Sequence, residues 1–498
     1  MDKRAAGILM PITSLPSEYG IGCFSKSAFE WIDFLQESGQ TFWQILPLGP
    51  TSYGDSPYQS FSTFAGNPYF IDLNTLIEEG VLTKKECNLA DFGSDSRFID
   101  YGKLYKARYK LLRKAYERSN ISQNPEFQTF QEENAWWLDD YSLFMAVKGF
   151  FQDECWDKWP EDIKKRYGYA LDYYREQLYF EIEFQKYMQF EFSIQWKKLK
   201  TYANENGIRI IGDIPIYVAY DSADTWAHPE LFQLDEENVP LAVAGCPPDG
   251  FAADGQLWGN PLYRWDYHRR TGYTWWMQRL SYAFYLYDVV RIDHFRGFDE
   301  YFSIPYGDTT ARNGHWEKGP GIELFHRMKE VLGERDVIAE DLGYVTDSVR
   351  QMVLESGFPG MKVFEFAFDS RDTGCAGDYL PHNYPVNSVV YTGTHDNATL
   401  IGWYQDIPKE SREMLRDYIH DYTTSDRSLH WSVICRVMGS PARICMIPMQ
   451  DYLGLNNTCR INTPSTLGTN WKWRLLDGEF TSDLQNKIKK LVRIYQRN

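Results

Sequence analysis

The sequence predicts an α/β protein, a (β/α)8 TIM barrel, from three observations. Eight short apolar runs recur along the 498 residues, with helical stretches between them. Three of these runs lead into acidic residues, Asp293, Glu340 and Asp396. The composition, 43% hydrophobic and 24% charged, provides ample material for a large globular core. Buried parallel strands with carboxylates at or beyond their exits are typical of barrel enzymes.

The eight apolar runs are the predicted barrel strands. Most are rich in Val, Ile, Leu and Phe, and several are followed by Gly, Pro or Asp, as expected where a strand ends. The first and the sixth are only moderately β-branched. In chain order the runs cover residues 6–10, 41–46, 208–218, 288–293, 337–340, 361–366, 388–391 and 444–449.

The spacing of the runs predicts two insertions in what is otherwise one catalytic unit, residues 1–498. About 160 residues separate the second run from the third, far more than a barrel crossover needs. Residues 73–204 carry apolar and charged side chains at three-to-four spacing, which predicts a mainly helical inserted subdomain. Residues 219–287 are rich in Gly, Pro and Trp, which predicts inserted loops that cover the barrel mouth.

The composition argues against several partners. Asp and Glu outnumber Lys and Arg by 69 to 52, and this net charge of −17 is unlike that of a nucleic-acid-binding protein. We expect no membrane association, because no apolar run reaches about 18 residues. The apolar stretch after Lys3 and Arg4 is broken by Pro11 and is too short for a secretion signal. The eight cysteines form no C-x-x-C pair, so we expect free thiols and a cytoplasmic location.

Aromatic side chains are unusually frequent. The chain has 30 Phe, 35 Tyr and 17 Trp, together 16% of its residues. Aromatic rings stack on the apolar faces of sugar rings, and Tyr and Trp keep a polar group for hydroxyls. Because most of these rings also serve the core, composition by itself only suggests a carbohydrate ligand.

Arg291 and Asp293 lie two residues apart on a predicted strand, so both side chains face the barrel interior. An arginine beside a carboxylate lowers its pKa and keeps it ionised, as a nucleophile requires. A structural ion pair that fills the barrel explains the two residues equally well. Asp213 lies within an apolar run and needs a partner if it is buried, and Arg291 on the neighbouring predicted strand is the obvious one.

Glu340 and Asp396 are further candidates for chemistry. A glutamate at a dry barrel mouth near other carboxylates has a raised pKa, as a general acid needs, although a solvated loop acid is the simpler explanation. Asp341 follows directly and points the other way, so the two acids have different tasks. His395 and Asp396 suit hydrogen bonds to sugar hydroxyls better than a metal, because the chain has no zinc-binding histidine spacing.

Several cofactor and nucleophile motifs are missing from the sequence. We find no Walker A motif, no G-x-G-x-x-G between a strand and a helix, and no G-x-S-x-G elbow. We therefore expect no nucleotide, redox cofactor or metal.

Together these motifs match a known family. The chain resembles the 4-α-glucanotransferases (amylomaltases, or disproportionating enzymes) of the α-amylase superfamily, nearly from end to end. The matching segments are residues 7–9, 13–16, 54–58, 212–217, 247–249, 255–261, 291–297, 339–343, 394–397 and 460–462.

The resemblance implies an activity and a set of roles. The enzyme transfers a segment of an α-1,4-glucan to the 4-hydroxyl of another glucan, without a cofactor. Asp293 is implied as the nucleophile, Glu340 as the general acid and base, and Asp396 as the acid that grips donor hydroxyls. The first two are then about 5–5.5 Å apart, as in retaining enzymes. The implied sugar-binding residues are Ser56, Tyr58, Asp213, Gln256, Trp258, Arg291, His294, Phe366, His395 and Asn462.

The chain departs from the family pattern at Cys23, Gly250, Asp254, Ser465 and Thr469, none of them a catalytic position. These departures bear on loop mobility, preferred chain length and acceptor choice. Two other functions stay open from the sequence. The first is an amylase-type hydrolase that uses the same carboxylates, and the second is a non-catalytic glucan-binding protein on a retained barrel. The sequence does not determine the oligomeric state.

Overall fold

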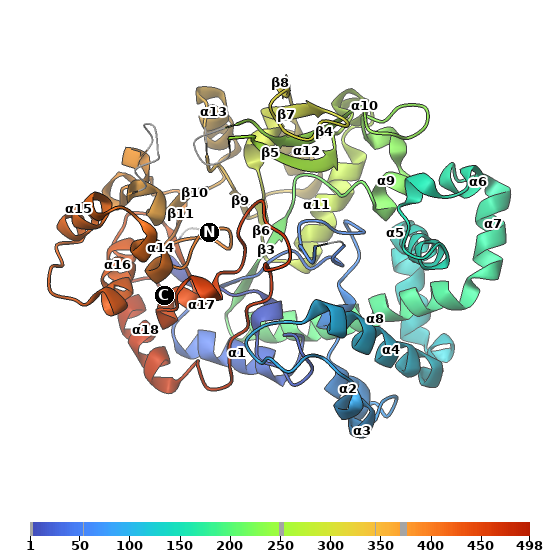
Figure 1. Cartoon of the computed structure of the whole chain (residues 1–498), viewed down its shortest axis with the longest axis horizontal. Helices are drawn as coiled ribbons and strands as arrows, with labels where there is room; N and C mark the ends of the chain where they lie inside the picture. Colours follow the sequence, from blue (N-terminus) through green and yellow to red (C-terminus); the bar gives the residue numbers. More distant parts are fainter. Residues whose placement is uncertain (1–2, 53, 249–252, 344, 369–375) are drawn as a thin grey trace.

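A closed barrel of eight parallel strands forms the centre of the computed structural model (Figure 1). The structure describes residues 3–52, 54–248, 253–343, 345–368 and 376–498. The barrel order is β1-β12-β11-β10-β9-β6-β3-β2. These strands are β1 (Ala5–Leu9), β2 (Phe42–Gln44), β3 (Arg209–Ile214), β6 (Val289–Ile292), β9 (Val337–Ala339), β10 (Gly360–Val363), β11 (Ser388–Tyr391) and β12 (Ile444–Pro448).

All eight predicted strands are confirmed, in chain order and with bounds that shift by a few residues. The barrel closes where β1 pairs in parallel with β12, with Ala5 opposite Ile444. The strands are buried on both sides, so they appear in the sequence as continuous apolar runs. Predicted strand ends that ran too far, such as 215–218 after β3, are loops that carry the chain away from the barrel.

Helices surround the barrel and fill most of the segment between β2 and β3 (Figure 1). Their bounds are α1 (Lys26–Glu37), α2 (Leu73–Glu78), α3 (Lys84–Leu89), α4 (Tyr101–Ser119), α5 (Pro125–Phe150), α6 (Glu161–Lys164), α7 (Gly168–Gln177), α8 (Tyr179–Glu205), α9 (Ala223–Ala227), α10 (Trp265–Arg270), α11 (Thr274–Leu286), α12 (Glu323–Leu332), α13 (Asp347–Ser356), α14 (Leu400–Asp406), α15 (Lys409–Ile419), α16 (Leu429–Met438), α17 (Met449–Leu453) and α18 (Ser482–Ile494). Over the described residues between β10 and β11 the chain forms only 3₁₀ turns. No helix in the described part of the chain is long and apolar enough to cross a membrane.

The prediction that residues 219–287 are loops is wrong in part. This segment contains helices α9, α10 and α11 and the strands β4 (Ala242–Cys246) and β5 (Gln256–Pro261). With β7 (Glu300–Pro305) and β8 (His315–Lys318), these strands form an antiparallel sheet in the order β5-β4-β7-β8. The strands were missed because β4 pairs with β7, which lies on the far side of β6 in the chain, and Gly and Pro around them resemble loop sequence.

Gly212 on β3 lets a helix approach the barrel closely. A Cβ atom at this position would lie 2.0 Å from Cγ of Tyr287, the residue that ends α11. The Tyr287 hydroxyl in turn accepts a hydrogen bond of 3.4 Å from the backbone N–H of Leu48. Helix α11 is thereby held against the strand that carries Asp213.

We predict that Gly212→Ala destabilises the protein by about 1–3 kcal/mol, because the added methyl group overpacks the Tyr287 ring. Thermal or denaturant unfolding measures the change. Gly149→Ala is the matched control, since Gly149 lies in helix α5 and a methyl group added there would have no neighbour within 4 Å among the described residues. Equal stability of the Gly212 variant and the wild type would contradict the packing argument.

Candidate active site

The candidate site lies at the carboxyl ends of neighbouring barrel strands. β3, β6 and β9 are adjacent in the barrel; Asp213 is the penultimate residue of β3, and Asp293 and Glu340 directly follow β6 and β9. Asp396 comes from the loop that follows β11. Because parallel strands all end at the same rim, the fold brings together acids that are far apart in the sequence.

Arg291 is the centre of this group. Its Nη1 donates to both carboxylate oxygens of Asp213, at 2.8 and 2.7 Å, and to Oδ1 of Asp293 at 3.0 Å. The side chains of Arg291 and Asp213 are 4% and 0% exposed, whereas that of Asp293 is 29% exposed. The predicted partnership of Asp213 with Arg291 is confirmed, and of the two acids only Asp293 is open to the cleft.

The expected net lowering of the Asp293 pKa is wrong. Burial raises the pKa of Asp293 to about 6, and Arg291 opposes this shift without cancelling it, while Asp213 and Asp396 add to it. The Arg291 guanidinium itself has a pKa raised well above its ordinary value, because the attraction of Asp213 and Asp293 outweighs its burial. Asp293 is thus half ionised near pH 6 and mostly ionised by neutral pH.

Glu340 is held by two backbone N–H groups. Its Oε2 accepts from the N–H of His294 at 2.6 Å, and its Oε1 accepts from the N–H of Leu342 at 3.0 Å. His294 adopts a left-handed backbone with φ of 51° directly after Asp293, and this turn aims its N–H at the glutamate. Nothing in the sequence marks this turn, because the residue is not a glycine.

Burial raises the pKa of Glu340 to about 7, which confirms the expected raised value. Arg291 and the two backbone N–H groups oppose the shift, and the charge of Asp293 adds to it. Asp293 and Glu340 therefore titrate as an interacting pair. Since Arg291 donates directly to Asp293, we expect the proton that the pair retains to reside on Glu340.

Asp396 has different surroundings. Asn462 Nδ2 donates to its Oδ1 at 2.6 Å, and His395 Nε2 lies 3.4 Å from its Oδ2. Arg460 Nη2 donates to its backbone carbonyl and helps to fix the loop. Although burial works in the opposite direction, the attraction and hydrogen bond of His395 and the hydrogen bond of Asn462 hold the pKa of Asp396 below its usual range. Asp396 is therefore ionised at any physiological pH.

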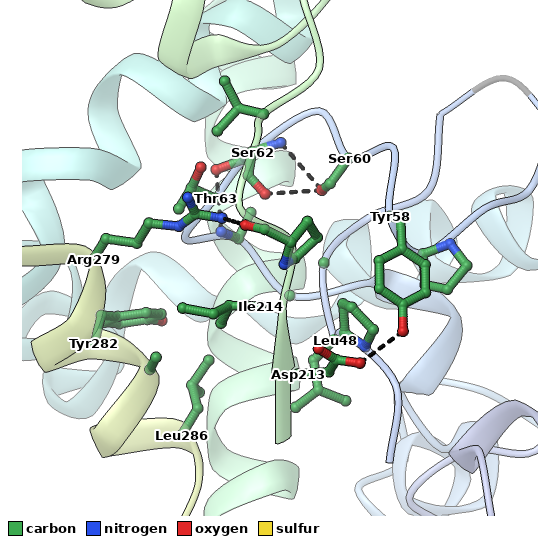
Figure 2. A pocket seen from close by; sticks show the side chains of 18 of the residues that line it. Leu48, Tyr58, Ser60, Ser62, Thr63, Asp213, Ile214, Arg279, Tyr282 and Leu286 are labelled. Atoms are coloured by element: carbon green, nitrogen blue, oxygen red, sulfur yellow. Dashed lines mark hydrogen bonds between the residues drawn. The ribbon is translucent and has the colours of Figure 1, made fainter. Parts of the chain in front are cut away.

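Aromatic rings form one wall beside these acids. The ring of Tyr58 stacks on that of His395 with centroids 5.2 Å apart, and its hydroxyl donates to Asp213 Oδ2 at 2.7 Å (Figure 2). The Trp471 ring lies 5.9 Å from Tyr58 and 6.1 Å from His395. We did not predict Trp471 from the sequence. Only its aromatic type pointed to a sugar site, and the chain has 17 tryptophans.

Behind Tyr58 and Asp213 lies a cavity of about 60 Å³ (Figure 2). It extends between β3 and α11 and is lined by Leu286 and Arg279, among others. Arg279 donates to the backbone carbonyls of Pro215 and Ile216, so its charge is used to fix the loop after β3. The cavity is large enough for ordered water, and Asp213 forms part of its lining.

Strand β5 carries Gln256 and Trp258, whereas the sequence predicts a loop over the barrel mouth at these residues. Their spacing of two puts them on the same face of the strand, and Trp258 Nε1 donates to Gln256 Oε1 at 3.0 Å. The Trp258 ring meets the His294 ring edge to face, with centroids 4.8 Å apart. Burial lowers the pKa of His294 to about 3, so this histidine is neutral. Asp249 and Gly250, named above from this loop, lie outside the described residues.

Two predicted residues have no described contact with the acids. Phe366 follows β10 and packs its ring edge to face on Tyr379, at 5.2 Å. Ser56 Oγ accepts from the N–H of Tyr58 at 3.3 Å and so fixes the turn that carries the tyrosine.

Asp341 points away from Glu340 and accepts from the N–H of Met361 at 2.7 Å. In the described part of the chain no group of three or more His, Cys, Asp or Glu side chains is arranged to hold a metal ion.

A parallel barrel that holds two interacting carboxylates at its rim, one of them paired with arginine and the other with a raised pKa, has the groups that an enzyme acting on glycosidic bonds needs. The sequence pattern of the 4-alpha-glucanotransferase family matches residues 10–479. The 4-alpha-glucanotransferase of Clostridium butyricum is 49% identical over 490 residues, 98% of this chain and 100% of that protein. That of Thermus thermophilus is 45% identical over 503 residues, 99% of each.

Among solved structures, the amylomaltase from Streptococcus agalactiae in complex with acarbose is similar over 100% of both chains, with a TM-score of 0.96 and 41% identity. The chain belongs to the 4-α-glucanotransferase family. It is a transglycosylase that acts on α-1,4-glucans, and a hydrolase of the amylase type is not favoured.

We predict a bell-shaped dependence of kcat/KM on pH, with its maximum between about 6 and 7. Activity rises as Asp293 ionises near pH 6 and falls as Glu340 loses its proton near pH 7. Initial rates of glucose release from maltotriose measure the profile. Asp396 and His294 do not shape it, because their pKa values lie below this range. A rate independent of pH between 5 and 8 would show that this pair does not control the reaction.

Proposed function

We propose that this enzyme transfers α-1,4-glucan segments by a retaining double displacement, with Asp293 as nucleophile and Glu340 as general acid and base. The observation that carries the proposal is the asymmetric environment of the two acids. Arg291 donates directly to Asp293 and favours its ionised form, while buried Glu340 keeps a proton near neutral pH. Such a pair supplies a nucleophile and an acid at the same pH.

In the first step, a carboxylate oxygen of Asp293 attacks the anomeric carbon of the donor sugar. The bond from this carbon to the glycosidic oxygen breaks, and Glu340 gives its proton to that oxygen as the shorter glucan leaves. In the second step, Glu340 takes the proton of an acceptor 4-hydroxyl. The acceptor oxygen then attacks the same carbon and releases Asp293 as a carboxylate, so the linkage keeps its α configuration.

The surrounding residues bind the donor sugar. Asp396 stays ionised and accepts hydrogen bonds from donor hydroxyls, oriented by Asn462 and His395. Two ring nitrogens, Nε2 of His294 and Nδ1 of His395, are buried and have no protein partner among the described residues, so they are available to sugar hydroxyls. The Tyr58 ring provides a stacking surface for the donor ring.

The remaining predicted binding residues hold other residues of the site in position. Arg291 and Asp213 fix the nucleophile, Ser56 fixes the Tyr58 turn, and Gln256 orients Trp258. Phe366 lies on the chain after β10, and its role as a sugar-binding residue rests on the family resemblance. Maltooligosaccharides and longer α-1,4-glucans serve as both donor and acceptor. A cytoplasmic location suits the seven described cysteines, all of which are free thiols.

Transfer competes with hydrolysis for the glycosyl-enzyme. An acceptor hydroxyl wins over water when it is held in position and water is kept away. Trp258 is placed to exclude water, because its ring stands over His294 next to the two reacting acids. Strand β5 holds it from the antiparallel sheet, so the position of the ring depends on that sheet.

We predict that Asp293→Asn abolishes the disproportionation of maltotriose, and that Glu340→Gln lowers kcat by about 10²–10⁴-fold. The amide at 293 removes the nucleophile, while the amide at 340 removes the proton donor. The measurement follows product lengths together with total reducing ends, which stay constant in transfer and rise in hydrolysis. Transfer by the Asp293 variant at the wild-type rate would overturn the assignment.

We predict that Trp258→Ala increases the fraction of glycosyl-enzyme lost to water, seen as reducing ends that rise during incubation with maltotriose. Leu257→Ala is the matched control, because Leu257 is the next residue on β5, faces the other way and is 39% exposed. The control keeps the number of reducing ends constant. An unchanged ratio of hydrolysis to transfer in the Trp258 variant would show that another group excludes water.

A further inference from the structure

A groove of about 430 Å³ lies on the outer surface between helices α11 and α12, with α5 at one side. Helix α11 turns its buried residues, among them Trp276, Leu280 and Ala283, towards the barrel. The groove lies on its other side, whereas the acids of the active site lie at the interior rim of the strands. Its volume falls in the range of about 300–1,000 Å³ typical of small-molecule sites.

Exposed side chains follow one stripe along α11. Thr274, Gln278, Ser281 and Tyr285 are all exposed, and their spacings of four, three and four place them on one face of the helix. The stripe is about 16 Å long at the rise of an α-helix. It therefore presents a row of hydroxyl and amide groups that ends in an aromatic ring.

Two exposed aromatic rings flank this row. Trp136 on α5 is 44% exposed and Tyr285 is 57% exposed. Tyr282 lies between them, with ring centroids 6.2 Å from Trp136 and 5.8 Å from Tyr285. Phe64 packs edge to face against Trp136 at 4.7 Å, so this ring is supported from behind while its open part faces the groove.

The groove is nearly free of charge in a protein whose formal net charge is −17. Among the eleven described residues that line it, Arg327 is the one charged side chain, and its Nη1 lies 3.1 Å from Glu330 on the same helix. An uncharged ligand rich in hydroxyl groups matches such a surface, since stacking rings and neutral hydrogen-bonding groups meet in one groove. A cationic ligand finds no opposite charge among these lining residues, and the one cation that an anionic ligand would meet, Arg327, is already paired with Glu330.

We propose that this groove is a second binding site for α-1,4-glucan chains, separate from the catalytic cleft. Trp136 and Tyr285 stack on sugar rings, while Gln278 and Ser281 bind hydroxyls. The proposal rests on the substrate class given under Proposed function. A long glucan that binds the groove and the catalytic cleft at the same time binds more tightly than a short one that reaches only one of them. The groove therefore favours long glucans over maltotriose.

The test measures retention of the protein in native gels that contain soluble amylose. All proteins carry Asp293→Asn, so that the polymer is not remodelled and the cleft contributes equally to each. We expect Trp136→Ala and Tyr285→Ala each to weaken the apparent dissociation constant about three- to tenfold, the loss of one aromatic contact. Ser281→Arg fills the groove from an exposed position without disturbing the core and has the same effect.

Tyr422→Ala is the matched control, because Tyr422 is 60% exposed and lies beyond helix α15, away from the groove. With the active nucleophile, the groove variants should keep the wild-type kcat/KM on maltotriose. Unchanged retention of all three groove variants would overturn the proposal, and so would an equal loss in the control. If the wild-type protein sediments as a dimer and the groove variants sediment as monomers, with retention unchanged, the proposal is overturned and the groove is a self-association surface instead.

The two proposals fail in different ways. If the wild-type protein leaves maltotriose unchanged while Tyr285→Ala still weakens retention, glucan binding in the groove is supported and the proposed function is overturned. If the wild-type protein disproportionates maltotriose and the substitutions at Tyr285, Trp136 and Ser281 leave retention unchanged, the proposed function is supported and the proposed groove site is overturned.

Discussion

The ion pairs of Arg291 inside the barrel are the interaction on which the rest of the site depends. A lone carboxylate buried at the position of Asp213 would cost several kcal/mol, and one guanidinium contacts both Asp213 and Asp293. The group around it still contains more acids than bases. Burial and the charge of Asp293 raise the pKa of Glu340, and a proton on Glu340 relieves this excess. In the proposed mechanism, the same electrostatic balance gives Asp293 and Glu340 the different protonation states that glycosyl transfer needs.

Main-chain geometry then fixes these acids in place. Asp293 receives its position from the end of β6, and the left-handed turn at His294 directs an N–H onto Glu340 at the end of β9. The two strands pair in parallel, so the two carboxylates are carried by neighbouring rigid elements and not by long loops. Such support matters because catalysis is sensitive to small displacements of the reacting groups. Asp396, by contrast, sits on a loop and depends on Asn462 and Arg460 for its position.

Segments outside the barrel strands contribute aromatic side chains. The turn after β2 contributes Tyr58, the antiparallel sheet contributes Trp258, and the long segment between β2 and β3 contributes Trp136 of the outer groove. Each of these residues is aromatic, so the roles proposed for them give part of the high aromatic content a use outside the core. Under the proposed function, the barrel provides the charged groups, and the segments outside it provide surfaces for uncharged sugar rings.

The sequence by itself determined the eight barrel strands, the candidate acids at Asp293, Glu340 and Asp396, and the pairing of Asp213 with Arg291. It could do so because strands buried on both faces leave continuous apolar runs, and because a charge within such a run requires a partner. The antiparallel sheet, the place of Trp471 and the net direction of the Asp293 pKa were decided only by the tertiary structure. Each depends on groups distant in the chain. β4 pairs with β7 across β6, Trp471 reaches Tyr58 from near the other end of the sequence, and burial outweighs the neighbouring arginine at Asp293. Local sequence encodes periodicity and charge, whereas burial is a property of the whole fold.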